Sequence, residues 1–208
     1  MLSLDKKIYP ILDWEYCEKE KIDPYSVLRV WEESEFISFY QLRAKNLGNE
    51  EYTELFKSMK RRTELPIVIN DKWEIALREN TYGIHLGKED FGELDSEGKL
   101  EIAKRIKFRG TSSHSIEDLK SLDPNYFSYS GLGPIFPTQN KLNPSPVLGL
   151  ETWKRISGQS PIPLVPIGGI DEKNFWEFFP KFCPAGIGLF TNIEFIGQIS
   201  KSYYKNLT

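Results

Sequence analysis

The chain has 208 residues, 39% of them hydrophobic, and a formal net charge of -3. This length fits one globular domain over residues 1–208, and the slightly acidic balance argues against a nucleic-acid partner, which needs a broad positive surface. No apolar run approaches the roughly 20 residues that span a bilayer and no secretion signal is evident, so we expect a cytoplasmic protein without membrane partners.

Short runs rich in β-branched and aromatic residues recur along the chain, each followed by a stretch of helical character. Strands are predicted at 8–13, 36–43, 66–70, 83–86, 106–109, 126–130, 163–167 and 186–190. Helices are predicted at 23–33, 50–62, 72–79, 95–104, 115–121, 150–156, 172–179 and 193–204. Eight such alternations favour a closed parallel barrel, because closure leaves no edge strand. The predicted fold is therefore α/β, a single (β/α)8 TIM barrel.

Two segments depart from the regular pattern. Pro10 removes a hydrogen-bond donor from the first strand, which is therefore expected to start late or to bulge. The segment 136–148 is polar and rich in Pro and Asn. We interpret it as a long loop after the sixth strand, on the face where such barrels bind their ligands.

The end of the second predicted strand carries polar side chains at alternate positions. Gln41, Arg43 and Lys45 share one face, because alternate residues of a strand point the same way. Leu42 and Ala44 face the other side. Two cations and an amide at the carboxyl end of a barrel strand suit a polyanion, although a solvated surface face explains the same pattern equally well.

Polar groups also follow the next three strands. Asp71, preceded by Asn70, ends the third strand, and Asp90 follows the fourth. Mg2+ prefers carboxylates together with substrate phosphate oxygens, so the two acids suit a magnesium diphosphate, although each also fits a helix cap. After the fifth strand, Ser112 lies in a hydroxyl-rich loop that suits an anion or a cap.

Neither the histidines nor the cysteines carry predicted chemistry. His85 and His114 lack metal-ligand spacing, so we assign them packed or hydrogen-bonded structural roles. Cys17 and Cys183 are far apart and outside any CxxC pair, which indicates reduced thiols rather than a disulfide or a zinc site.

Two glycine-containing loops follow the last strands. The segment 131–141 combines glycine turns with a hydroxyl, an amide and a cation. The seventh strand ends at Gly168 and Gly169, and the eighth ends near Thr191. Loops after the last two strands of such barrels frequently bind phosphate, because glycine lets backbone donors approach the oxygens.

These motifs together resemble the thiamine-phosphate synthase family, from about residue 8 to the last helix. The shared motifs span 41–45, 69–71, 83–90, 133–138 with Lys141, and 167–170. Each motif alone is weak, whereas their occurrence in the family's order is specific.

The resemblance implies a site with two phosphate subsites and Mg2+ as cofactor. The pyrimidine diphosphate is expected to contact Gln41, Leu42, Arg43, Ala44, Lys45, Asn70, Ser112 and Lys141, with the metal on Asp71 and Asp90. The thiazole phosphate is expected to contact Thr138, Gln139, Asn140, Gly169, Phe190 and Thr191. Arg43, Lys45 and Lys141 are the expected catalytic residues, because they would stabilise the departing diphosphate.

The implied activity condenses these two phosphorylated small molecules into thiamine phosphate. Pyrophosphate leaves first, and the thiazole nitrogen captures the pyrimidine-stabilised carbocation, a course that needs positioning and charge stabilisation rather than a nucleophile. Four positions depart from the family's usual residues, namely Ala44, Lys88, Asn140 and Thr191. Among them, Asn140 changes the hydrogen-bonding geometry and Lys88 adds a cation beside Asp90.

Two other functions fit the same barrel. A thiazole tautomerase-like paralogue generally loses the 134–138 loop and the full diphosphate set, both of which are present here. A barrel that binds a thiamine precursor without turnover is the other alternative, and the intact set of Arg43, Lys45, Asp71, Asp90 and Lys141 argues against it without excluding it. The sequence leaves the oligomeric state open, a homo-oligomer included.

Overall fold

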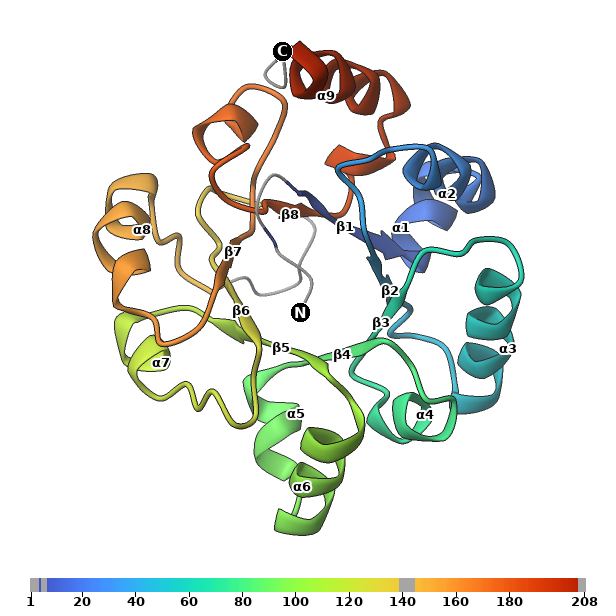
Figure 1. Cartoon of the computed structure of the whole chain (residues 1–208), viewed down its shortest axis with the longest axis vertical. Helices are drawn as coiled ribbons and strands as arrows, with labels where there is room; N and C mark the ends of the chain where they lie inside the picture. Colours follow the sequence, from blue (N-terminus) through green and yellow to red (C-terminus); the bar gives the residue numbers. More distant parts are fainter. Residues whose placement is uncertain (1–3, 5–6, 139–144, 206–208) are drawn as a thin grey trace.

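The computed structural model describes residues 4, 7–138 and 145–205. One eight-stranded sheet has the order β7-β6-β5-β4-β3-β2-β1-β8, with helices around it (Figure 1). Its parallel strands are β1 Tyr9–Asp13, β2 Tyr40–Arg43, β3 Ile67–Asn70, β4 Gly83–Leu86, β5 Phe108–Ser113, β6 Tyr129–Leu132, β7 Leu164–Pro166 and β8 Ala185–Gly186. A parallel bridge between Ile167 and Ala185 joins the two ends of the sheet. The predicted barrel architecture is confirmed.

Helices cover the outer face of the barrel (Figure 1). They are α1 Trp14–Glu20, α2 Pro24–Glu32, α3 Asn49–Lys60, α4 Trp73–Arg78, α5 Lys88–Glu93, α6 Ser96–Arg105, α7 Ile116–Lys120, α8 Leu150–Ile156 and α9 Ile193–Lys205, with the 3-10 turns η1 Ser157–Gln159, η2 Phe175–Glu177 and η3 Leu189–Thr191. The sequence pattern did not predict α1 or α5, which follow β1 and β4 closely. Within the described residues, no helix combines the length and the apolar character that a membrane span requires.

The connection between β7 and β8 differs from the prediction. The predicted helix 172–179 contains only the single turn η2. Oδ1 of Asp171 accepts hydrogen bonds from the N–H groups of Lys173 and Asn174, at 2.9 and 3.0 Å. This Asx turn offers the backbone an alternative to helical hydrogen bonds, so a longer helix does not form.

The eighth strand is also shorter than predicted. The expected strand 186–190 is reduced to the two residues of β8, and the chain then turns into η3. The indole N–H of Trp31 donates to the carbonyl oxygen of Phe190 at 2.8 Å. Because a helix outside the barrel takes this carbonyl, the segment is held as a turn rather than as a strand.

The fifth and sixth strands lie further along the chain than predicted. β5 continues to Ser113, and β6 begins at Tyr129. Their pairing places Ser112 opposite Gly131, and the hydroxyl oxygens of Ser113 and Ser130 lie 2.8 Å apart. Ser112 is therefore a strand residue, and its assignment to a loop was wrong.

Pro10 lies inside β1, so the expected late start is not observed. β1 pairs with β8 through Tyr9 and Pro10, and its register with β2 begins only at Ile11. The missing N–H group is tolerated because the ladder to β2 starts after the proline.

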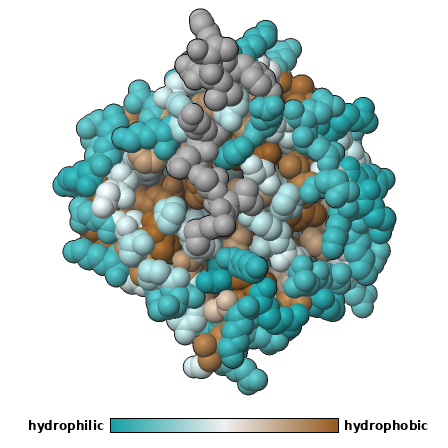
Figure 2. Space-filling view, in the orientation of Figure 1, coloured by the Kyte–Doolittle hydropathy of each residue, from teal (hydrophilic) through white to brown (hydrophobic). Residues whose placement is uncertain are grey.

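An aromatic layer fills the barrel interior near the start of the strands. It consists of Tyr9, Phe39, Phe108 and Tyr129, whose ring centroids lie 4.7 to 5.5 Å apart in edge and stacked contacts. Burial of each such side chain contributes roughly 1.5–3 kcal/mol to stability. Hydrophilic residues dominate the outer ring of the surface (Figure 2). The aromatic layer gives the polar side chains nearer the strand ends a closed floor.

We predict that Gly110→Ala destabilises the barrel. A Cβ at this position would lie 2.0 Å from Cζ of Tyr129, which is fully buried and stacked on Phe108. Overpacking of this kind costs roughly 1–3 kcal/mol, which chemical denaturation would detect. Gly92→Ala in α5 is the control, because nothing lies within 4 Å of its added Cβ. Equal stabilities of the two variants would contradict the interior packing.

Candidate functional site

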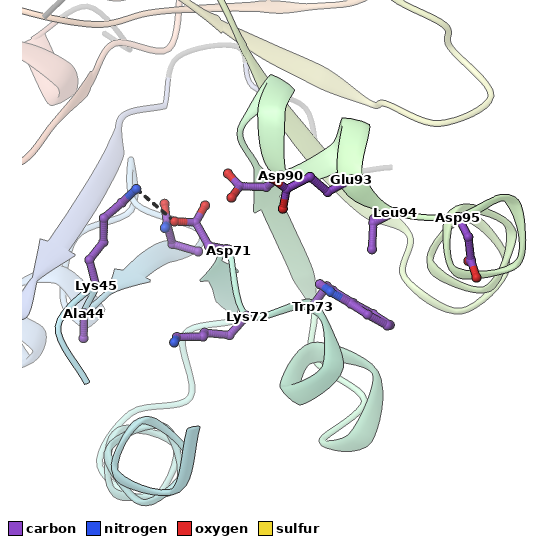
Figure 3. Close-up of a pocket in the computed structure, with 10 residues that line it drawn as sticks. Ala44, Lys45, Asp71, Lys72, Trp73, Asp90, Glu93, Leu94 and Asp95 are labelled. Carbon is purple, nitrogen blue, oxygen red and sulfur yellow. Dashed lines mark ion pairs between the residues drawn. The ribbon is translucent and has the colours of Figure 1, made fainter. Parts of the chain in front are cut away.

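A cavity of about 700 Å³ opens at the carboxyl ends of β2, β3 and β4. Five of the residues predicted to bind the diphosphate or its metal line it: Ala44, Lys45, Asn70, Asp71 and Asp90. Lys72, Trp73, Glu93, Leu94 and Asp95 complete the lining. In Figure 3, Asp90 reaches from α5 toward Asp71, beside Lys45. Predicted residues from separate strands thus lie at one mouth of the barrel.

The negative charge of Asp71 affects the ionisation of Asp90 across this cavity. Partial burial, and next the negative charge of Asp71, raise the pKa of the Asp90 carboxyl above its ordinary value. Nζ of Lys45 lies 3.0 Å from Oδ2 of Asp71 and offsets part of this charge. Two carboxylates close together favour a cation between them.

The backbone at Asp71 is unusual. Its φ of 62° lies in the left-handed region, which Asp and Asn adopt more readily than most other residues with a side chain. The N–H of Asp71 donates to the carbonyl oxygen of His85 at 3.0 Å, so this turn is tied to the end of β4. The acid is therefore held at the strand end rather than at the tip of a free loop.

Gln41, Arg43 and Lys45 lie at successive heights above the aromatic layer. The buried Gln41 donates from Nε2 to the hydroxyl of Tyr9 at 2.9 Å. Arg43 forms an ion pair with Asp13, its partner in the register between β1 and β2. Lys45 extends past the strand end to Asp71. This face lies at the barrel mouth, so a solvated outer surface does not explain the pattern.

A chain of hydrogen bonds crosses the barrel interior and links Gln41 to Ser112. The hydroxyl oxygens of Tyr9 and Tyr129 lie 2.6 Å apart. Tyr129 also lies 3.1 Å from Nδ1 of His85, and Nε2 of His85 lies 3.0 Å from Oγ of Ser112. Burial lowers the pKa of His85 to about 4, so its ring is neutral at neutral pH. The expected hydrogen-bonded role of this histidine is confirmed.

Backbone hydrogen bonds join the loop after β6 to the end of β7. The N–H groups of Ile135 and Phe136 donate to the carbonyl oxygens of Ile167 and Gly168, at 3.1 and 3.0 Å. Gly169 has a φ of 67°, and a Cβ there would lie 2.6 Å from the carbonyl oxygen of Phe136. Glycine at this position therefore allows the two predicted phosphate loops to lie in contact.

The segment after β8 has fewer free groups for a phosphate than the sequence implied. The side chain of Phe190 is buried in the core, and its carbonyl oxygen is bound by Trp31. Oγ1 of Thr191 donates to the carbonyl oxygen of Gly188 at 2.8 Å. The hydroxyl hydrogen is therefore already committed, and the N–H group of Thr191 also donates to the carbonyl oxygen of Gly188, at 3.3 Å.

Some predicted residues do not lie on the main cavity. Gln139, Asn140 and Lys141 fall outside the described residues. Arg43 does not line the cavity, and the side chain of Leu42 is fully buried in the core, so only its backbone remains for a ligand.

Ser112 and Lys88 meet in a neighbouring cavity. This second cavity, of about 260 Å³, also borders Asp118 on α7. Nζ of Lys88 lies 2.7 Å from Oδ1 of Asp118, and this contact raises the pKa of Lys88. Lys88 is therefore paired with a carboxylate from α7, and the cation that acts on Asp90 is Lys45.

Sequence reasoning missed Asp13 together with Tyr9 and Tyr129. The available signal was alternation, because Tyr9, Ile11 and Asp13 follow each other on one side of β1 as Gln41 and Arg43 do on β2. Asp13 is the last inward residue of its strand, and that position is the one where polar groups meet at the mouth of such a barrel.

The sequence is similar to that of proteins from one family. The sequence model of the family described as thiamine monophosphate synthase matches residues 8–187. A thiamine-phosphate synthase from Persephonella marina is 33% identical over 190 residues, with 88% of this chain and 86% of that protein covered. One from Clostridium tetani is 38% identical over 137 residues, with 64% of each chain covered. The chain thus spans under two thirds of the Clostridium relative's length.

Solved structures share the fold. A thiamine phosphate pyrophosphorylase from Pyrococcus furiosus superposes with a TM-score of 0.72 at 25% identity, covering 95% of this chain and 96% of that chain. A tryptophan synthase alpha-subunit from the same organism has a TM-score of 0.61 at 13% identity, covering 98% and 96%. The latter likeness concerns the barrel alone.

We predict that charge changes around the cavity shift the pKa of Asp90 in opposite directions. Asp71→Asn removes a negative charge and keeps a residue that tolerates the left-handed backbone, so the pKa of Asp90 should fall. Lys45→Met removes a positive charge, so it should rise. A carbon-13 NMR titration of the Asp90 carboxyl measures both shifts. An unchanged pKa in both variants would show that the three groups do not share a cavity.

Proposed function

This chain belongs to the thiamine monophosphate synthase family, and we propose that it joins a pyrimidine diphosphate to a thiazole phosphate, releasing pyrophosphate. One observation carries this proposal: Lys45, Asn70, Asp71 and Asp90 line a single cavity at the carboxyl ends of neighbouring strands. The cavity combines a cation, an amide and two acids, which together suit a diphosphate and its metal.

The acids in the cavity fit Mg2+ as cofactor. Among the described residues, no three His, Cys, Asp or Glu side chains are grouped to hold a metal by themselves. Mg2+ is commonly bound through one or two carboxylates plus substrate phosphate oxygens, and two carboxylates, those of Asp71 and Asp90, line the cavity. When bound there, the metal would neutralise charge on the diphosphate.

The residues of the chain then stabilise the departing diphosphate. The bond between the pyrimidine methylene carbon and the diphosphate oxygen breaks with its electron pair on oxygen, and the thiazole nitrogen donates a pair to the resulting carbocation. Lys45 can exchange Asp71 for a phosphate oxygen when the acid takes the metal. Arg43 and Lys141 are proposed to add positive charge. Preorganised charge of this kind lowers a barrier without a nucleophile.

The thiazole phosphate is proposed to bind where the loops after β6, β7 and β8 approach each other. Gly169, with its left-handed backbone, would present its N–H group, and η3 would add the backbone N–H group of Phe190, next to Thr191. Thr138, Gln139 and Asn140 complete this part of the proposal. Residues 1–208 are proposed to form one catalytic domain that acts in the cytoplasm on these small molecules.

A reconstitution assay tests the proposed function. The purified protein is supplied with each precursor alone and then with both, with and without Mg2+. Magnesium-dependent pyrophosphate release only in the presence of both precursors is the expected result. Isomerisation of the thiazole alone would indicate a tautomerase, and saturable binding without product would indicate a binding protein.

We predict that Asp90→Asn lowers pyrophosphate release roughly a hundredfold at limiting Mg2+. Excess Mg2+ should restore part of the rate, because the remaining carboxylate of Asp71 still binds the metal. Glu89→Gln is the matched control: this exposed neighbour on α5 does not line the cavity, so its rate should equal that of the wild type. A rate for Asp90→Asn equal to that of Glu89→Gln would remove Asp90 from the site.

A further inference from the structure

Asp13 is a buried acid at the barrel mouth that the proposed function does not use. Its side chain is 5% exposed, and it ends β1 directly opposite Arg43, the last residue of β2. The carboxylate and the guanidinium form an ion pair, in which Oδ2 of Asp13 accepts from an Nη1 of Arg43. A buried carboxylate requires such a partner, because an unpaired buried charge is costly.

The second oxygen of Asp13 starts helix α1. Oδ1 accepts a hydrogen bond from the N–H group of Tyr16 at 2.8 Å, so Asp13 is the N-cap of this helix. Because both oxygens are engaged, the carboxylate has little freedom to rotate. The guanidinium that it binds is therefore held against a fixed group rather than against a mobile side chain.

Helix α1 also holds the other end of the same segment. Oε1 of Glu15 accepts from the N–H group of Asn46 at 2.8 Å. Arg43 forms the first of these two contacts, and Ala44 and Lys45 lie between it and Asn46. The first turn of α1 thus fixes both ends of the segment that carries the two proposed diphosphate cations.

Arg43 remains able to bind a ligand while it is paired. Its side chain is 23% exposed, and the pair with Asp13 uses Nη1. Guanidinium is planar and presents donors along more than one edge, so one edge can bind a carboxylate while another binds phosphate. A long unrestrained side chain would instead lose rotamer freedom on binding.

We propose that Asp13 is a positioning residue, which fixes the Arg43 guanidinium at the barrel mouth, beside the cavity that Ala44 and Lys45 line. This inference rests on the proposed function. Two effects of Asp13 oppose each other, because its negative charge weakens anion binding while its contact orients Arg43. Orientation dominates for turnover, since a reacting group displaced by about 1 Å can cost roughly a hundredfold in rate.

Asp13→Asn separates positioning from helix capping. Asn is as good an N-cap as Asp, so α1 keeps its cap, and any fall in the midpoint of thermal unfolding should come from the lost ion pair with Arg43. We expect kcat to fall roughly tenfold to a hundredfold, while KM for the thiazole phosphate stays unchanged. Asp23→Asn is the control, because Asp23 caps α2 through the N–H groups of Tyr25 and Ser26; its kcat should equal that of the wild type.

A double-mutant cycle shows whether Asp13 acts through Arg43. In an Arg43→Ala background, Asp13→Asn should change kcat by less than about twofold, because the group to be positioned is gone. A kcat for Asp13→Asn equal to or above the wild-type value, with tighter binding of magnesium pyrophosphate, would overturn the inference. A wild-type protein without turnover would instead reject the proposed function. Calorimetric titration with magnesium pyrophosphate would then compare Asp13→Asn with the wild type. Weaker binding by the variant would support the positioning role, and tighter binding would overturn it.

Discussion

Charge pairing between neighbouring strand ends organises the mouth of this barrel. Arg43 pairs with Asp13 from β1 to β2, and Lys45 pairs with Asp71 from β2 to β3. Parallel strands in register place their last inward side chains next to each other, so a cation on one strand meets an acid on the next. The pair of Arg43 and Asp13 is largely buried, so salt screens it less than a surface pair, whereas Lys45 is about half exposed. The arrangement keeps the cations ordered before any anion arrives.

A set of hydrogen-bonded side chains lies beneath these ion pairs. The chain of hydrogen bonds from Gln41 through Tyr9, Tyr129 and His85 to Ser112 crosses the barrel just above the aromatic layer. Burying any of these polar groups without a partner would lower the stability of the fold. The five side chains are therefore held in place by one another. Two predicted substrate residues on opposite sides of the barrel are thereby held in a constant relation to each other.

Sequence alone predicted the barrel, because strand and helix periods alternate clearly along most of the chain. It also placed Lys45, Asp71 and Asp90 at one mouth, since carboxyl ends of parallel strands share one side. It could not predict the partner of Lys88, because Asp118 comes from a helix that packs there only in the folded chain. It missed the short β8 for a similar reason, as the contact from Trp31 spans much of the sequence. Tertiary contacts of this kind leave little trace in local pattern.

The closure of the barrel has a consequence for ligand binding. Every other neighbouring pair of strands shares a ladder, whereas in the described chain β7 and β8 meet through the single bridge between Ile167 and Ala185. This seam is the place with the fewest backbone contacts between strands, and the turns on its two sides, at Gly169 and at η3, are those proposed to bind the thiazole phosphate. A phosphate bound by both turns would connect the end of β7 to the turn after β8. Binding of the second substrate would then stabilise the closed barrel, because the ligand joins the two strands that share the fewest backbone contacts.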